Sequence, residues 1–157
     1  EKEPKLVDFG LAQPVDAEQE EYGAVWGTPY YIAPEKVQHH KETFLSDMYS
    51  LAGTLYHALT QHVPFEAPTV EEVVAAHIHT PLTPPHLVRP EISVPTSEAI
   101  TRAMAKDPAE RFQSYEEFRM ALEAARSQYL VNRFVRHQPP PSEPRSKTGK
   151  LRGWFRR

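Results

Sequence analysis

Residues 44–60, FLSDMYSLAGTLYHALT, constrain the fold more than any other part of the sequence. Their apolar side chains recur at the three- and four-residue spacing of an α-helix: Leu45, Met48, Tyr49, Ala52, Leu55, Tyr56 and Leu59. This spacing predicts a helix over 44–60 that buries one face. Ser46 is expected near its start as a cap or first-turn residue. The Val-Pro-Phe at 63–65 ends the helix, because proline cannot continue it.

Three further segments have helical signals and indicate a mainly α fold: 70–77, 97–105 and 115–129. Ser114 and Glu117 have the spacing of a capping box at the start of the last one. The five prolines of 80–95 predict an irregular loop. Residues 11–32 lack any period and are predicted to be a long loop, and 4–7 is a short strand candidate.

Composition excludes several classes of site. The chain has no cysteine, so it has no disulfide, no thiolate nucleophile and no Cys-based zinc site. A hydrophobic content of 39% is enough for one globular domain of ordinary size. No apolar run approaches the roughly 20 residues that cross a membrane. The charged N-terminal residues do not have the pattern of a signal peptide.

Charge divides the chain into an acidic body and a basic tail. Residues 133–157 hold eight Lys/Arg and one acidic residue, a net charge of +7, and the remainder carries −10. The sequence HQPPPSEPRSK within the tail is typical of a linker and is predicted to be disordered. We therefore expect a domain over 1–132 and a basic, Pro-rich tail or juxtamembrane linker over 133–157.

Four short motifs carry the functional signal. VDFG at 7–10 places a carboxylate at the end of a predicted strand, and a carboxylate supplies the hard oxygen ligand that Mg²⁺ prefers. GTPYYIAPE follows at 27–35, SDMYSL lies on the predicted central helix, and DPAERF at 107–112 precedes the last helix. In this order and spacing, the motifs resemble the C-terminal lobe of a bacterial, eukaryotic-type serine/threonine protein kinase over about residues 5–130.

The resemblance implies ATP and Mg²⁺ as cofactors. Asp8 is expected to bind the Mg²⁺ that bridges the β- and γ-phosphates, so it is both a catalytic and a metal-binding residue. Phe9 and Gly10 complete the cofactor-binding motif, and the position of Phe9 helps to set active and inactive states. Without the other motifs, a turn residue after a strand would be the favoured interpretation of Asp8.

A second group of residues is implied to receive the protein substrate. Thr28 matches the hydroxyl that hydrogen-bonds near the catalytic base in Ser/Thr kinases. Gly27, Thr28, Pro29 and Tyr30 are expected to form the surface for the substrate segment beyond the acceptor. GTPxY before APE is the Ser/Thr type of this motif, and tyrosine kinases differ there. The alternative for Thr28, before a proline, is a simple turn former.

A third group is implied to be structural. Glu35 of APE is expected to pair with Arg111, and Asp47 is expected to anchor the backbone of the catalytic loop from the central helix. The aromatic residues of these motifs are expected to be core rather than contact residues: Tyr30, Tyr31, Tyr49 and Phe112.

The remaining parts of a kinase are absent from the sequence. The N-terminal lobe, with its glycine-rich loop and strand lysine, and the catalytic loop with its base, are not found. The resemblance therefore implies phosphorylation of protein Ser/Thr hydroxyls by the parent enzyme, with the chain alone inactive. The alternative is a pseudokinase or a kinase-like module for protein interaction. The sequence does not specify the oligomeric state.

The paired histidines and Gln61 lie outside these motifs and have interpretations of their own. His39-His40 and the pair His77 and His79 could be metal ligands, but without a third ligand they are better interpreted as exposed helix-end residues. Gln61 stands where the family commonly has a helix-ending glycine, and a left-handed Gln61 would carry a strain of about 1 kcal/mol.

The tail, ending in KTGKLRGWFRR, has three interpretations. It is a linker, the cytoplasmic flank of a membrane helix, or a segment that contacts anionic lipid or nucleic acid through charge. We favour a linker or flank, with residues 145–157 as the candidate contact to an anionic membrane surface and no specific nucleic acid as partner. The expected location is the cytoplasm or the cytoplasmic face of a membrane.

Overall fold

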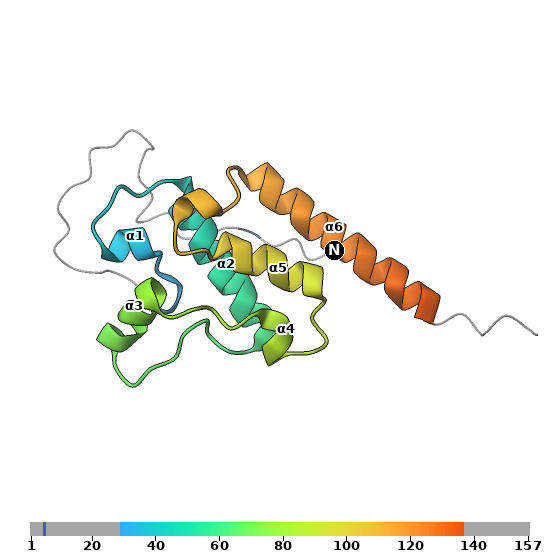
Figure 1. Cartoon of the computed structure of the whole chain (residues 1–157), viewed down its shortest axis with the longest axis horizontal. Helices are drawn as coiled ribbons and strands as arrows, with labels where there is room; N and C mark the ends of the chain where they lie inside the picture. Colours follow the sequence, from blue (N-terminus) through green and yellow to red (C-terminus); the bar gives the residue numbers. More distant parts are fainter. Residues whose placement is uncertain (1–4, 6–28, 137–157) are drawn as a thin grey trace, which may run out of the picture.

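The computed structural model describes Lys5 and residues 29–136 (Figure 1). This part of the chain is helical and contains no strand, which confirms the predicted mainly α class. Its elements, in order, are η1 (Pro29–Tyr31), α1 (Pro34–Val37), α2 (Phe44–Thr60), α3 (Val70–His79), α4 (Pro85–Val88), α5 (Val94–Ala103), η2 (Pro108–Glu110) and α6 (Tyr115–Arg136). Lys5 is the one described residue of the predicted strand at 4–7 and does not test it, and the motif VDFG lies outside the described residues.

Helix α2 has the predicted bounds and forms the centre of the fold. Thr43 is its N-cap, and the Ser46 hydroxyl in the first turn accepts a hydrogen bond from the Thr43 backbone N–H, which makes a reciprocal capping box. At the other end, Gln61 adopts a left-handed conformation with φ 65° and donates its backbone N–H to His57 O. Gln61 thus ends the helix in the conformation for which the sequence analysis expects backbone strain.

Helix α5 begins earlier than predicted. The sequence predicted a start at Ser97, but the helix starts at Val94, capped by the Ser93 hydroxyl, which accepts from the Thr96 backbone N–H. Pro95 lies in the first turn, where its missing N–H leaves no helical bond unmade. The prolines of 80–95 likewise permit α4, a short helix inside the predicted irregular loop, whose first residue is Pro85.

Helix α6 is longer than predicted, since it continues seven residues past Tyr129 and beyond the expected domain boundary at 132. The Ser114 hydroxyl accepts from the Glu117 backbone N–H, as a cap should. The Glu117 carboxylate, however, accepts from the backbone N–H of Gln113 rather than that of Ser114. Of the predicted capping box, the hydrogen bond to the Ser114 hydroxyl is confirmed, whereas the return bond from the Ser114 N–H to Glu117 is wrong.

The core lies between α2, α5 and α6. Helix α5 packs against α2 on one side and α6 on the other, and η1 packs against both α2 and α3. Figure 1 shows α6 running along the edge of this group, with α2 and α5 crossing at its centre. Fully buried side chains on α2 and α5 join the helices: Met48, Tyr49, Ala52, Ile100 and Ala103. No helix among the described residues is long and apolar enough to span a membrane.

Candidate functional site

Half of the predicted site residues lie in the described part of the chain. Pro29 and Tyr30 form η1, Glu35 lies on α1, Asp47 lies in the first turn of α2, and Arg111 follows η2. The other half lie outside the described residues, and their roles remain predictions: Asp8, Phe9, Gly10, Gly27 and Thr28.

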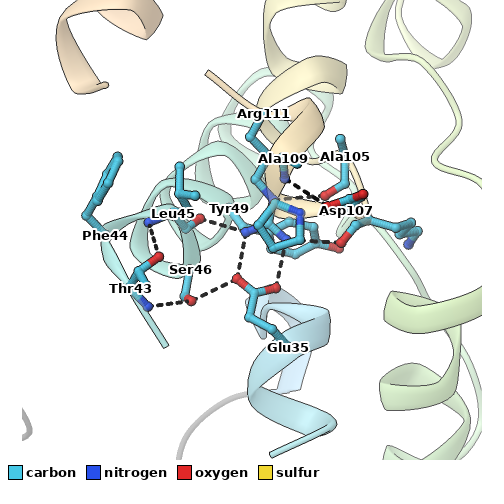
Figure 2. Close-up of polar contacts among 12 residues, drawn as sticks. Glu35, Thr43, Phe44, Leu45, Ser46, Tyr49, Ala105, Asp107, Ala109 and Arg111 are labelled. Carbon is cyan, nitrogen blue, oxygen red and sulfur yellow. Dashed lines mark hydrogen bonds and ion pairs between the residues drawn. The ribbon is translucent and has the colours of Figure 1, made fainter. Parts of the chain in front are cut away.

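Glu35 and Arg111 form a buried, bidentate ion pair (Figure 2). Arg111 Nη1 donates to Glu35 Oε1 and Arg111 Nη2 to Glu35 Oε2, each at 2.7 Å. The arginine is fully buried and Glu35 is 6% exposed. The parallel arrangement of two N–H donors on two carboxylate oxygens is the strongest form of such a pair.

Arg111 also bonds three backbone carbonyls. Its Nη1 donates to Leu45 O at 2.8 Å, its Nε to Ala105 O at 2.9 Å and its Nη2 to Lys106 O at 3.3 Å. Its guanidinium group lies over the Tyr49 ring, 4.9 Å from the centroid. The guanidinium donors are thus shared between α1, the start of α2 and the segment before η2.

The Glu35 carboxylate has a further partner that the sequence did not reveal. The Ser46 hydroxyl donates to Glu35 Oε1 at 2.8 Å and accepts from the Thr43 backbone N–H, so the cap of α2 and the ion pair are continuous (Figure 2). Burial alone would raise the pKa of Glu35, but the hydrogen bonds from Arg111 and Ser46 lower it below 4.5. Glu35 is therefore ionised at neutral pH.

The turn η1 lies directly before this network. Tyr31 is held by His57 of α2: its hydroxyl lies 2.7 Å from His57 Nδ1, and the two rings are stacked. Tyr30 is 36% exposed, so the expectation that it is a core residue is wrong, whereas Tyr49 and Phe112 are buried as expected. The outward position of Tyr30 is consistent with a contact residue.

His77 is fully buried, and its interpretation as an exposed helix-end residue is wrong. Its Nδ1 lies 2.8 Å from the Tyr49 hydroxyl, and its ring meets Phe65 edge to face. Burial lowers the pKa of His77 to about 4, and the ammonium group of Lys106 acts in the same direction. His79, two residues later, is exposed.

Asp47 is exposed at the start of α2, and no hydrogen bond among the described residues involves its carboxylate. Partial burial raises its pKa, and the neighbouring Glu42 carboxylate adds to the effect. The predicted role of Asp47, to anchor the backbone of the catalytic loop, stays a prediction.

The described residues do not form a metal centre. Within residues 29–136, no group of three or more His, Asp or Glu side chains could hold a metal ion. The predicted ligand Asp8 lies outside this range. What the described residues provide is a rigid support, since the turn η1 is held between α2 and α3 and followed by a buried ion pair.

The comparisons with known proteins agree with this geometry. The protein kinase domain family matches residues 1–130. The chain is 35% identical over 128 residues to serine/threonine-protein kinase Pkn1 of Myxococcus xanthus, covering 80% of this chain and 18% of that protein. It is 40% identical over 111 residues to PknD of Mycobacterium tuberculosis, covering 69% and 17% of the two chains. It is 36% identical over 121 residues to PknE of the same species, covering 76% and 21%. The chain thus spans about a fifth of the length of these relatives.

Proposed function

This chain belongs to the protein kinase domain family, and on that basis we propose that it is the C-terminal part of an enzyme that transfers phosphate from ATP to Ser or Thr hydroxyls of proteins. The observation that carries the proposal is the buried pairing of Glu35 with Arg111. These residues come from two motifs 76 positions apart, and their pairing was expected from the kinase resemblance alone.

In this enzyme, Asp8 would hold Mg²⁺ together with the nucleotide phosphates, because its carboxylate is a hard oxygen ligand. Bound there, the ion offsets the negative charge of the phosphates during transfer. Thr28 would hydrogen-bond near the catalytic base, which the upstream part of the enzyme supplies. The segment Gly27–Tyr30 would receive the substrate residues that follow the acceptor.

The described residues contribute positioning rather than bond-making. Phosphoryl transfer depends mainly on alignment and on stabilisation of charge, so the surface that receives the acceptor must be rigid. The Tyr31–His57 hydrogen bond just before the APE motif and the Glu35–Arg111 pair within it provide this rigidity. We expect the enzyme to act in the cytoplasm or at the cytoplasmic face of a membrane.

A phosphate-transfer assay tests the proposal. The parent enzyme, with this chain joined to its upstream part, is given labelled ATP, Mg²⁺ and peptides that differ only in a Ser, Thr or Tyr acceptor. We expect label on Ser and Thr peptides, and a loss of at least about a hundredfold in Asp8→Asn. Asp16→Asn removes one carboxylate from the same part of the sequence and serves as the matched control. Full activity of Asp8→Asn would overturn the role of Asp8.

The second candidate function is a pseudokinase, a kinase-shaped module for protein interaction. The presence of Asp8 argues against it, because a module without catalysis has no need of a metal-binding carboxylate. A folded parent protein that binds partners but neither binds Mg²⁺-ATP nor labels any peptide would favour this alternative.

A further inference from the structure

A polar cluster formed by α2, α3 and the segment before η2 has no role in the proposed function. It consists of Tyr49 on α2, His77 on α3, Phe65 between these helices, and Lys106 before η2; we call it the His77 cluster. The Lys106 ammonium group donates to the backbone carbonyls of Ala76 and His77, at 3.2 and 2.7 Å, and lies over the Phe65 ring. It therefore fixes the last turn of α3, on which His77 stands.

His77 has one satisfied and one unsatisfied ring nitrogen. Nδ1 is 2.8 Å from the Tyr49 hydroxyl, whereas the buried Nε2 has no hydrogen-bond partner among the described residues. Buried polar groups without a partner are rare and costly, so each needs an explanation.

The tautomer follows from counting partners. If Nδ1 carried the proton, the Tyr49 hydroxyl hydrogen and the Nε2 lone pair would both be unpaired within the described residues. If Tyr49 donates to Nδ1, the proton is on Nε2, and this N–H alone is unpaired. Burial raises the pKa of Tyr49, which keeps its hydroxyl protonated and able to donate. The arrangement with the proton on Nε2 is therefore favoured.

The backbone of Tyr30 is the group that a protonated Nε2 would meet. It lies near the His77 ring and favours a proton there, which a backbone group does only through its carbonyl oxygen. In this structure Nε2 makes no hydrogen bond to that carbonyl. Helix α3 nevertheless packs against η1, so the helix that carries His77 lies next to the turn that carries Tyr30.

We propose that His77 is a positioning residue for η1: Tyr49 fixes its ring with the proton on Nε2, and this N–H attracts the Tyr30 carbonyl and so holds the turn in the position that receives the acceptor peptide. The inference rests on the proposed function, because η1 is the turn that would receive the peptide. His77 touches neither ATP nor the acceptor, and it acts through the turn alone.

A first experiment needs only the 157-residue chain. Nitrogen-15 NMR of the histidine rings at neutral pH should show His77 neutral with its proton on Nε2. A proton on Nδ1, or a charged ring, would overturn the proposal whether or not the parent enzyme is active. Exchange of the Ile32 amide, which closes η1 on Pro29 O, should be faster in His77→Asn than in His77→Gln. Equal exchange in the two variants would also count against the proposal.

A second experiment uses the same two substitutions in the parent enzyme. The Gln amide nitrogen lies near the position of Nε2, whereas the Asn amide reaches only as far as Nδ1. His77→Asn should raise the KM for the peptide about threefold to tenfold, the equivalent of one hydrogen bond, with the KM for ATP unchanged. His77→Gln should restore most of this affinity. A purely structural role predicts instead that both variants lose kcat and ATP affinity together.

Matched tyrosine variants provide the control. Tyr49→Phe removes the hydroxyl that fixes His77, and it should raise the peptide KM as His77→Asn does. Tyr56→Phe removes a hydroxyl from the same helix, at a site that is 2% exposed and has no hydrogen-bond partner among the described residues, and it should change neither KM. If the unmodified parent enzyme labels no peptide, the proposed function fails, and the NMR and exchange results still decide the role of His77.

Discussion

Arg111 is the residue on which the described part of the chain depends most, because one buried cation joins α1, α2 and the segment before η2. We expect Arg111→Met to lower the free energy of unfolding by about 3–5 kcal/mol, because it leaves Glu35 charged, buried and unpaired. Urea unfolding of the chain measures this loss. It is a large share of the roughly 5–15 kcal/mol that stabilises a typical domain.

The matched control is Arg119, whose pairs with Glu116 and Glu123 are exposed on α6. Arg119→Met should leave the free energy of unfolding almost unchanged, because solvent screens exposed pairs. Equal effects of the two substitutions would show that the buried pair is not the main support of this region.

His77 should make stability depend on pH. Its pKa is lowered from 6.5 to about 4 in the folded chain, so the unfolded chain takes up the proton first as the pH falls. Stability should therefore decrease between about pH 6.5 and 4, by up to roughly 3 kcal/mol. The lowered pKa of Glu35 adds a further loss only below 4.5.

Urea unfolding between neutral pH and about pH 5 measures the His77 effect before Glu35 contributes. His77→Gln should flatten the pH dependence, whereas His79→Gln, at an exposed position on the same helix, should leave it unchanged. An unaltered slope in His77→Gln would mean that another group is responsible.

For single residues, the sequence predicted an interaction where both partners stand in recognisable motifs. It did not predict interactions between residues that no motif links. The Glu35–Arg111 pair was predicted because both residues stand in recognisable motifs. Burial of His77 was not, since its partner Tyr49 is 28 positions away and nothing in the local pattern links them. The hydrogen bond from Ser46 to Glu35 was missed because Ser46 already had a sufficient role as a cap.

Among the helices, the predicted bounds were accurate where the sequence marks the end of the helix clearly. The bounds of α2 were predicted because a periodic apolar face is followed by Val-Pro-Phe, whereas its N-cap, Thr43, was revealed by the structure alone. The start of α5 and the existence of α4 were not predicted, because the prolines of 80–95 indicate an irregular loop rather than a helix. Within a first turn, proline costs no hydrogen bond, and both helices use it there.

Gln61 provides a test at the end of α2. A residue other than glycine in the left-handed region is strained, so Gln61→Gly should raise the free energy of unfolding by roughly 0.5–1 kcal/mol. Gln38 is the matched control, because it is the C-cap of α1 with φ −83°. Gln38→Gly should lower stability by a similar amount, and stabilisation by both changes would contradict the account of strain.

For the whole molecule, the kinase resemblance predicts that the catalytic base and most of the ATP site lie outside this sequence. The 157-residue chain should therefore transfer no phosphate from ATP to a Ser or Thr peptide, because one metal ligand without a base cannot align the reaction. The labelled-ATP assay described above measures this directly. Transfer by the purified chain that Asp8→Asn abolishes would contradict the prediction.

The fold class of the whole molecule was predictable because motif order and helical periodicity agree. The exposed apolar side chains at the end of α6 were not foreseen, because the predicted helix ended at Tyr129: Leu130, Val131, Phe134 and Val135. The contact of residues 145–157 with an anionic membrane surface remains a prediction, since these residues lie outside the described part of the chain.

The measurement that tests the central claim most directly is the coding sequence upstream of Glu1, read in frame for about 150 codons. The account predicts a glycine-rich loop, a strand lysine and an HRDxxxxN catalytic loop, which together would make this chain the C-terminal part of an active Ser/Thr kinase. An intact frame in which that lysine or the catalytic aspartate is replaced would contradict the account and indicate a pseudokinase.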